Sequence, residues 1–478
     1  MHLTEVRVPA RSLRRFESVI GASLVNEALG AAEALQRRLG GRVIWNVNST
    51  AVGGGVAEML QSLLSYVRGA GINTRWLVIR GDEPFFRVTK RLHHALHGAA
   101  GDGSPLGEGE RRIYEAALRT NIVELRAFVE PGDIVILHDP QTAGMVKALA
   151  EAGARVIWRC HIGWEQRNDE TELGWRFLAP YLGAAHAFVF SRHAYVPPPC
   201  DDGRAVIIQP SIDVFSAKNQ ALSEETVRAI LVHAGIVEGP MPEAVRPGFV
   251  RSDGAPGRVA RSADVIRLGR APTWGAPMVV QISRWDPLKD MEGVMRGFAE
   301  GFGHTLPATA ELVLAGPNVH GVADDVEGPE VFSRVLAAWR LLPHAVRQRV
   351  HLINLPTVDV EENAAIVNAL QRHATVIVQK SLREGFGLTV TEAMWKERPV
   401  IASDVGGIRD QIEDGKSGLL LHDPADLAGL GRLLGRVLGD PAEQRRLGQA
   451  ARERVMERFL GVRHLLDYKM LIERCDAA

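Results

Sequence analysis

Twelve short apolar runs, separated by longer amphipathic segments, are the feature of this sequence that most restricts its fold. The runs are rich in Val and Ile and do not alternate apolar with polar residues, which is typical of strands buried on both faces of a parallel sheet. The strands predicted in the first half of the chain are 42–48, 74–79, 133–138, 155–161, 187–191 and 205–210. Those predicted in the second half are 277–283, 311–317, 349–354, 375–379, 399–403 and 418–422.

The segments between these runs have the spacing of helices. The clearest one follows the first strand, where one apolar stripe is formed by Val56, Met59, Leu60, Leu63, Leu64 and Val67. A chain of 478 residues is too long for one ordinary core. Strand and helix alternating in both halves therefore predict an α/β protein with two doubly wound, Rossmann-like domains.

The domain boundary is expected within residues 238–276, which are dense in Pro, Gly and Arg and have little periodicity. A long surface insertion in the first domain is the alternative interpretation of this stretch. We predict one domain over 1–270, a second over 271–455, and a C-terminal helix over 456–478 that crosses back to the first domain. The two sheets are expected to face a central cleft at the carboxyl ends of their strands, where such folds bind ligands.

Composition excludes several classes of protein. Lys and Arg (56) balance Asp and Glu (57), which argues against nucleic-acid binding. The three cysteines form no CxxC pair, and neither HExxH nor Asp-x-Asp occurs, so no metal site is predicted. Without an apolar run that resembles a signal peptide or a membrane span, we expect a cytoplasmic protein that does not enter a membrane.

Three glycines, Gly53, Gly54 and Gly55, lie at the turn between the first strand and its helix. Bare backbone N–H groups at a helix N-terminus can bind an anion or a sugar, because no side chain blocks close approach. A tight turn packed on the sheet is the alternative. The GxGxxG pattern of dinucleotide-binding proteins fails, since Glu58 occupies the third glycine position.

Two cations, Arg284 and Lys289, lie in the loop after the strand at 277–283. A forked guanidinium and an ammonium five residues apart suit a diphosphate. Alone the pair is weak evidence, because cations in loops are commonly just solvated. A second anion site expected after a later strand of the same sheet strengthens the interpretation.

That second site is the loop and helix start after the strand at 375–379. Its glycines let backbone N–H groups converge on an anion. The residues concerned are Gly385, Phe386, Gly387, Leu388 and Thr389. Glu384 can reach sugar hydroxyls, and Glu392, one turn into the helix, can accept from a ribose diol. A capping box formed by Thr389 and Glu392 is the alternative role for this carboxylate.

His161 ends the strand at 155–161 and is expected to point into the cleft. A histidine in such a position has either a structural or a functional role.

Several of these segments resemble the signature of retaining glycosyltransferases of family 4. They are "EGFGLTVTEA" (384–393), "SRWDPLKD" (283–290) and "PVIASDVGGIRDQI" (399–412). Within that family, further segments resemble the branch of trehalose glycosyltransferring synthases and trehalose phosphorylases. These are "NSTAVGGGVAEML" (48–60), "FFRVTKRLHHALHG" (85–98) and "QPSIDVFSAKNQ" (209–220).

The resemblance implies a GT-B fold, with an acceptor-side first domain and a nucleotide-sugar donor site on the second domain. It places Arg284 and Lys289 on the diphosphate, Glu392 on the ribose and Glu384 on the donor glucose. His161 would contact the sugar from the first domain, where the glycines at 53–55 would face the donor.

The activity that the resemblance implies is retaining transfer of glucose from a nucleoside-diphosphate glucose to glucose, forming trehalose reversibly. The expected ligands are a nucleotide sugar and a small sugar acceptor, with no cofactor or obligatory metal, and a homodimer is one assembly the sequence allows. The alternatives are a trehalose phosphorylase that uses inorganic phosphate and a family 4 enzyme with another acceptor. A glycosidase with paired carboxylates and a non-catalytic two-lobed sugar-binding protein are more distant alternatives.

Overall fold

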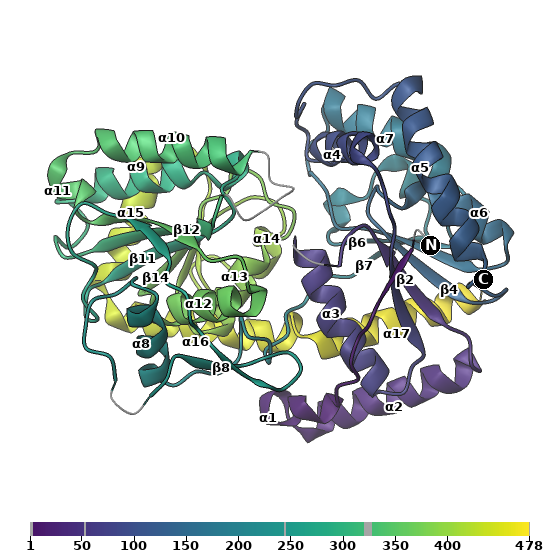
Figure 1. Ribbon diagram of the computed structural model, residues 1–478, viewed down its shortest axis with the longest axis horizontal. Helices are drawn as coiled ribbons and strands as arrows, with labels where there is room; N and C mark the ends of the chain where they lie inside the picture. The colour runs from purple at the N-terminus through teal and green to yellow at the C-terminus, as the bar shows by residue number, and fades with distance from the viewer. Residues whose placement is uncertain (1–2, 52–53, 243–244, 320–326, 478) are drawn as a thin grey trace. The chain divides into compact units, whose positions relative to one another are not determined.

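The computed structural model describes residues 3–51, 54–242, 245–319 and 327–477 (Figure 1). The chain divides into two compact units, each built around a seven-stranded sheet. Unit 1 comprises Met1–Ser211 and Phe459–Ala478, and unit 2 comprises Ile212–Arg458. The predicted class, two doubly wound α/β domains, is confirmed.

The sheet of unit 1 has the strand order β1-β3-β2-β4-β5-β6-β7 and is parallel except for the antiparallel edge strand β1. Its strands are β1 (Thr4–Val6), β2 (Ile44–Asn48), β3 (Thr74–Val78), β4 (Ile134–His138), β5 (Arg155–Cys160), β6 (Ala187–Phe190) and β7 (Ala205–Ile207). All six predicted strands are present, and β1 was not predicted because three residues are too few to show a pattern.

The helices of unit 1 cover both faces of this sheet. They are α1 (Glu17–Ile20), α2 (Ala22–Leu39), α3 (Gly54–Gly69), α4 (Glu83–Leu96), α5 (Glu108–Arg126), α6 (Val146–Glu151), α7 (Asp169–Leu182) and α17 (Gly461–Ala477). Short 3-10 helices are η1 (Leu13–Phe16), η2 (Ala143–Met145), η3 (His193–Tyr195) and η4 (Pro198–Cys200). The apolar stripe predicted after the first strand lies on α3, where all of its residues except Val56 are buried.

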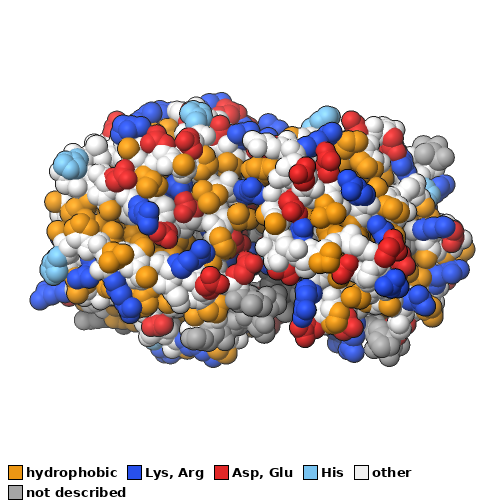
Figure 2. Space-filling model, turned by 90° about the horizontal axis from the view of Figure 1, so that it is seen from above, with side chains coloured by type: hydrophobic (Ala, Val, Ile, Leu, Met, Phe, Trp, Pro, Cys, Tyr) orange, Lys and Arg blue, Asp and Glu red, His pale blue; other side chains and the backbone are white. Residues whose placement is uncertain are grey.

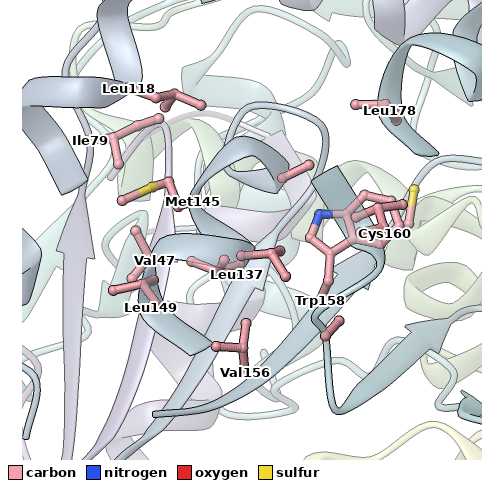
Figure 3. Packing of buried hydrophobic residues seen from close by; sticks show 14 of the residues in the cluster. Val47, Ile79, Leu118, Leu137, Met145, Leu149, Val156, Trp158, Cys160 and Leu178 are labelled. Atoms are coloured by element: carbon pink, nitrogen blue, oxygen red, sulfur yellow. The ribbon is translucent and has the colours of Figure 1, made fainter. Parts of the chain in front are cut away.

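Successive side chains of each strand point to opposite faces, and so the two faces have different cores. On one face Leu137 and Trp158 pack against residues of α5, α6 and α7, as Figure 3 shows. On the other face Ile136 and Ile157 pack against α2, α3 and α17. The same alternation sends the polar residues Asn46, His138 and Arg159 to this second face.

The sheet of unit 2 has the order β10-β13-β12-β11-β14-β15-β16 and is parallel except for β10 at its edge. Its strands are β10 (Asp264–Ile266), β11 (Met278–Ile282), β12 (Glu311–Pro317), β13 (Val350–Leu355), β14 (Val376–Gln379), β15 (Val400–Ser403) and β16 (Leu419–Leu421). A separate hairpin pairs β8 (Gly248–Val250) with β9 (Pro256–Arg258). The six strands predicted in the second half are all present.

The helices of unit 2 complete a second doubly wound layer structure. They are α8 (Glu224–His233), α9 (Met291–Gly301), α10 (Gly328–Leu341), α11 (His344–Arg347), α12 (Val360–His373), α13 (Leu388–Trp395), α14 (Ile408–Gln411), α15 (Leu427–Gly439) and α16 (Pro441–Arg458), with the 3-10 helix η5 (Pro287–Lys289).

The boundary between the units lies at 211/212 rather than at the expected 270/271. Residues 212–270 pack with unit 2, because α8 lies on α12, β10 pairs with β13, and Arg251 forms an ion pair with Asp359 at 2.5 Å. The Pro- and Gly-rich stretch at 238–276 is therefore no linker but contains three strands of three residues each. The last helix, α17, packs on α2 and α3 of unit 1.

The surface carries both signs of charge. On the face drawn in Figure 2, Lys and Arg side chains are interspersed with Asp and Glu, as the near-equal totals of 56 and 57 lead one to expect. Among the helices of the described residues, none combines the length and the apolar character needed to span a bilayer.

Candidate functional site

In unit 2 the predicted site residues gather where the strand order reverses. The first parallel strand, β11, lies between β12 and β14, so the loops that follow β11 and β14 leave the same edge of the sheet in opposite directions. Ligands of open α/β sheets bind at such a switch point. Arg284 and Lys289 follow β11, and Glu384 follows β14.

Two ion pairs connect these loops, and each loop supplies one cation and one anion. The Nζ of Lys289 lies 2.7 Å from Oε2 of Glu384. In the reverse sense, Lys380 of the β14 loop pairs with Asp290 of the β11 loop. The sequence predicted Lys289 and Glu384 as separate ligands of a diphosphate and a sugar, whereas the structure joins them directly.

Exposure separates the roles of these charges. The side chain of Lys380 is 2% exposed and that of Glu384 10%, whereas that of Arg284 is 53% exposed and pairs with Asp286 at 3.2 Å. Lys380 therefore fixes the two loops to each other, while Arg284 can turn toward a ligand. A buried side chain amide, that of Gln281, assists by donating to the carbonyl of Lys289 at 2.7 Å and accepting from the N–H of Lys380 at 2.9 Å.

The turn before α13 has the geometry of an anion site. Gly387 caps the helix with φ of 85°, in the left-handed region, and a Cβ there would lie 3.0 Å from Cγ of Glu384. Glycine is thus required both by the backbone conformation and by the close approach of Glu384. The first N–H groups of α13 lie at the positive end of its helix dipole, which begins at this turn.

The backbone of this turn is supported from behind by the segment that leads into α14. The N–H of Gly407 donates to the carbonyl of Gly385 at 3.1 Å, and the side chain amide of Gln411 donates to the carbonyl of Phe386. A Cβ on Gly407 would lie 2.6 Å from Cα of Phe386. The "DVGGIRDQ" run therefore supports the turn at 385–387, and this contact was not predicted.

Glu392 is not part of a capping box. Because α13 begins at Leu388, Thr389 is already inside the helix and Glu392 lies one turn further on. The Glu392 carboxylate is 8% exposed and lies 3.6 Å from the Nζ of Lys218. The capping-box role considered for Glu392 is therefore wrong. The structure shows Glu392 instead as a buried carboxylate beside the ammonium group of Lys218.

A buried lysine holds the segment that carries Lys218 against α13. The Nζ of Lys396 donates to Oδ1 of Asn219 at 2.8 Å, to Oε1 of Gln371 at 2.7 Å and to the carbonyl of Glu392 at 3.0 Å. Burial lowers the pKa of Lys396 well below its usual value, and the charge of Glu392 acts in the opposite sense. The segment 209–220 thus reaches the surroundings of Glu392 in two ways. Lys218 lies beside its carboxylate, and Asn219 accepts from Lys396, which also donates to the carbonyl of Glu392.

In unit 1 the strand order reverses at β2, between β3 and β4. The three glycines follow β2 in the sequence. Gly53 lies outside the described residues, Gly54 begins α3, and Gly55 continues it. The start of α3 therefore follows the strand at which the order of this sheet reverses.

His161 follows β5 and stacks on His138 at the end of β4, with their rings 5.4 Å apart. The Nε2 of His161 lies 3.0 Å from Nδ1 of His138, whose Nε2 lies 3.3 Å from Oδ1 of Asn46. Asp139, with φ of 64°, accepts the backbone N–H of His161 at 2.7 Å. His138 and Asp139 were not predicted, although "HDP" directly after a buried strand is a sequence signal for them.

Burial shifts the pKa values of His138, Asp139 and His161. It lowers the pKa of His161 well below 6.5, with further lowering by Arg159, and lowers the pKa of His138 to about 3. Both imidazoles are therefore neutral at pH 7 and offer hydrogen bonds rather than charge. Burial also raises the pKa of Asp139 to about 7.

Comparison with known proteins identifies the family of this chain. The family model for the trehalose synthase N-terminal domain matches residues 46–197, and that for group 1 glycosyl transferases matches residues 351–454. Trehalose synthase of Pyrococcus horikoshii is 35% identical over 96% of this chain and 95% of its own length.

Two more distant proteins were also found. Trehalose phosphorylase of Pleurotus pulmonarius is 25% identical over 93% of this chain and 58% of its own length. The structure of a UDP-forming α,α-trehalose-phosphate synthase from Burkholderia xenovorans superposes with a TM-score of 0.67 at 15% identity, covering 90% of this chain and 100% of that one. The fold is accordingly GT-B, and the chain belongs to the trehalose synthase family of glycosyltransferases.

Proposed function

We propose that the protein is a retaining glucosyltransferase that moves glucose from a nucleoside-diphosphate glucose to free glucose, forming α,α-trehalose reversibly. The observation that carries this proposal is the pairing of Lys289 with Glu384 at the switch point of unit 2, beside the N-terminus of α13. Relatives named trehalose synthase, identical at 35% over nearly the whole chain, support the acceptor and the product.

The diphosphate would lie between the loop after β11 and the start of α13. An ammonium has three donors, so Lys289 can keep its bond to Glu384 and still donate to a phosphate oxygen. Arg284 is exposed enough to turn toward the same group and bind it through two parallel N–H donors. Backbone N–H groups of Leu388 and Thr389 supply the remaining positive field.

The two carboxylates would hold the two sugars of the donor. Glu384, kept in place by Lys289 and by the hydroxyl of Ser381 at 3.1 Å, accepts from hydroxyls of the transferred glucose. Glu392, with Lys218 beside it, accepts from the ribose diol.

In the proposed reaction the acceptor hydroxyl attacks from the face that the diphosphate leaves, so the configuration at the anomeric carbon is retained. The bond from that carbon to the diphosphate oxygen breaks, and the bond to the acceptor oxygen forms. The acceptor proton passes to the leaving diphosphate oxygen. Arg284, Lys289 and the N–H groups of α13 stabilise the charge that develops on the diphosphate.

A trehalose phosphorylase is the second candidate, because relatives of that name align with most of this chain. Such an enzyme would place inorganic phosphate between the same cations and release glucose 1-phosphate. It has no ribose to bind, and so the buried Glu392 carboxylate beside Lys218 favours the nucleotide-dependent reaction.

Nucleotide binding to a variant at this carboxylate tests the proposal. The nucleotide used is whichever of UDP, ADP and GDP binds the wild type best. We expect Glu392→Gln to weaken its binding at least tenfold, which corresponds to about 1.4 kcal/mol. Glu397→Gln, at an exposed carboxylate of the same unit, is the matched control and should leave affinity unchanged. Equal affinities in Glu392→Gln and wild type would remove the ribose assignment.

A further inference from the structure

Three buried polar residues connect the ring of His161 to the interior of unit 1. They are Thr74 of β3, Asn46 of β2 and His138 at the end of β4, which are 1%, 3% and 2% exposed. We call these three residues the polar chain. Hydrogen bonds run along it from Thr74 to His161, and the direction of each bond follows from the chemistry of its two atoms.

The inner end of the polar chain fixes its direction. The hydroxyl of Thr74 lies 2.9 Å from the carbonyl oxygen of Ile44, and a carbonyl oxygen can only accept. Because the hydroxyl has a single proton, which it donates there, it meets Asn46 as an acceptor. The Asn46 atom that lies 3.2 Å from it is therefore the amide nitrogen Nδ2, and Oδ1 faces His138.

His138 passes this direction on to His161. Its Nε2 lies 3.3 Å from Oδ1 of Asn46, which only accepts, so Nε2 carries the proton. A neutral imidazole has one N–H, which leaves Nδ1 of His138 as an acceptor. The Nε2 of His161, 3.0 Å away, is therefore the donor of the next bond. Burial and the charge of Arg159 lower the pKa of both rings, which keeps them neutral at pH 7.

The second ring nitrogen of His161, Nδ1, is then left without a proton. In a neutral imidazole that donates through Nε2, Nδ1 is an acceptor only. The ring is partly exposed, and in the described part of the chain its Nδ1 has no hydrogen-bond partner. A ligand that reaches this nitrogen meets an acceptor rather than a donor.

We infer that the polar chain holds His161 in the tautomer with the proton on Nε2, so that Nδ1 accepts a hydrogen bond from a hydroxyl of the bound sugar. Thr74, Asn46 and His138 are thus positioning residues. The sugar contact rests on the proposed function, whereas the tautomer rests only on contacts within unit 1. A site that must accept a hydrogen bond selects a hydroxyl against any group that has no proton to donate.

Heteronuclear NMR of the imidazole nitrogens tests the tautomer, because a ring nitrogen without a proton resonates far from one that carries a proton. The full-length protein is measured at pH 7 without ligand, and the signals that disappear in His161→Gln identify His161. We expect a protonated Nε2 and an unprotonated Nδ1. The opposite tautomer, an equal mixture of the two or a doubly protonated ring would overturn the inference.

Two substitutions at Thr74 test the polar chain itself. Thr74→Val removes the hydroxyl, so neither orientation of the Asn46 amide is favoured, and both tautomers of His161 should be populated. Thr74→Ser keeps the hydroxyl and should keep the wild-type tautomer. Thr74 is the first residue of β3, whereas ligands of such sheets bind at the carboxyl ends of the strands, so neither substitution removes a ligand contact.

Melting curves establish that each variant is folded before its spectrum is compared. An unchanged tautomer in folded Thr74→Val would contradict the role of the polar chain. The wild-type spectrum decides the tautomer even if Thr74→Val does not fold.

The sugar contact is tested by adding trehalose together with the nucleoside diphosphate that binds best. A hydrogen bond to a bare ring nitrogen moves its resonance toward that of a protonated one. Trehalose should therefore move the Nδ1 signal of His161 in that direction and leave Nε2 in place. Trehalose that is bound, as measured by calorimetry, without any movement of Nδ1 would contradict the sugar contact. Failure of trehalose to bind would contradict the proposed function as well, whereas the ligand-free spectrum decides the tautomer independently.

Discussion

Lys289 and Arg284 have the same charge and lie in the same loop, but their surroundings give them different weight. Lys289 neutralises a nearly buried carboxylate, whereas Arg284 is half exposed with one weak partner. Exposed ion pairs contribute little to stability, but a buried charge that loses its partner costs several kcal/mol. Substitution of Arg284 is therefore expected to lower activity alone, whereas substitution of Lys289 should lower both activity and stability.

We predict that Arg284→Ala and Lys289→Ala each lower kcat/KM at least tenfold, which corresponds to about 1.4 kcal/mol of transition-state stabilisation. Only Lys289→Ala should also lower the melting temperature clearly, because Glu384 then loses its cation. Lys416→Ala, at an exposed lysine of the same unit, should change neither quantity. Wild-type turnover in Arg284→Ala or Lys289→Ala would remove the diphosphate assignment.

The pH dependence of stability should reveal Asp139. Burial raises its pKa from 3.8 to about 7, although the backbone N–H of His161 and the charge of Arg159 both act to lower it. A raised carboxyl pKa means that the protonated form is preferred in the folded state, so its stabilising effect is complete below pH 3.8 and is lost as pH rises toward 7.

We therefore predict that wild type loses stability relative to Asp139→Asn between pH 5 and pH 8. The expected relative loss is about 2–3 kcal/mol, because pH 5 lies two units below the pKa of about 7 and each pKa unit corresponds to about 1.4 kcal/mol. Urea unfolding of both proteins at the two pH values measures it, and groups common to both cancel. A difference that does not change with pH would show that Asp139 is ionised normally.

At the scale of elements, the start of α13 should depend on one glycine. Gly387→Ala forces a Cβ into the left-handed region at a cost of about 1–2 kcal/mol. The same Cβ contacts Glu384, so turnover should fall together with stability. Gly109→Ala within α5, where a Cβ meets nothing within 4 Å, should instead leave turnover unchanged and stability equal or higher.

Thermal unfolding and kcat/KM of the two glycine variants give the comparison. Full activity in Gly387→Ala would show that the Glu384 position is not coupled to this turn.

The strands show what periodicity can and cannot predict. The predicted strands include all ten strands of four or more residues in the described part of the chain, because two covered faces demand a continuous apolar run. The three-residue strands β8, β9 and β10 were not, because their burial depends on partners far along the chain. That omission is also the reason that the boundary was expected near 270 instead of at 211/212.

The site divides in the same way. The sequence alone could assign Lys289 and Glu384 to loops of one sheet, where the structure pairs them, while their roles toward a ligand stay predictions. Lys380 and its contact with Asp290 could not be predicted, because the contact requires β11 and β14 to be neighbours.

For the whole molecule, the two units use one construction twice. Each places its chemically active loops at the switch point of a doubly wound sheet, β2 and β4 in unit 1 and β11 and β14 in unit 2. Among the loops that carry the predicted site residues, those of unit 2 hold Lys289, Glu384 and Lys218 beside Glu392, and those of unit 1 hold the stacked imidazoles of His138 and His161. This distribution underlies the proposal that the nucleotide sugar binds to unit 2.

Release of glucose from trehalose is the measurement that tests the account most directly. The purified protein is incubated with trehalose and either UDP, ADP, GDP or inorganic phosphate, and free glucose and glucose 1-phosphate are measured. The account predicts glucose release that requires a nucleoside diphosphate, with retention seen by NMR as a nucleotide-linked α-glucose. Formation of glucose 1-phosphate from trehalose and phosphate without any nucleotide would contradict it.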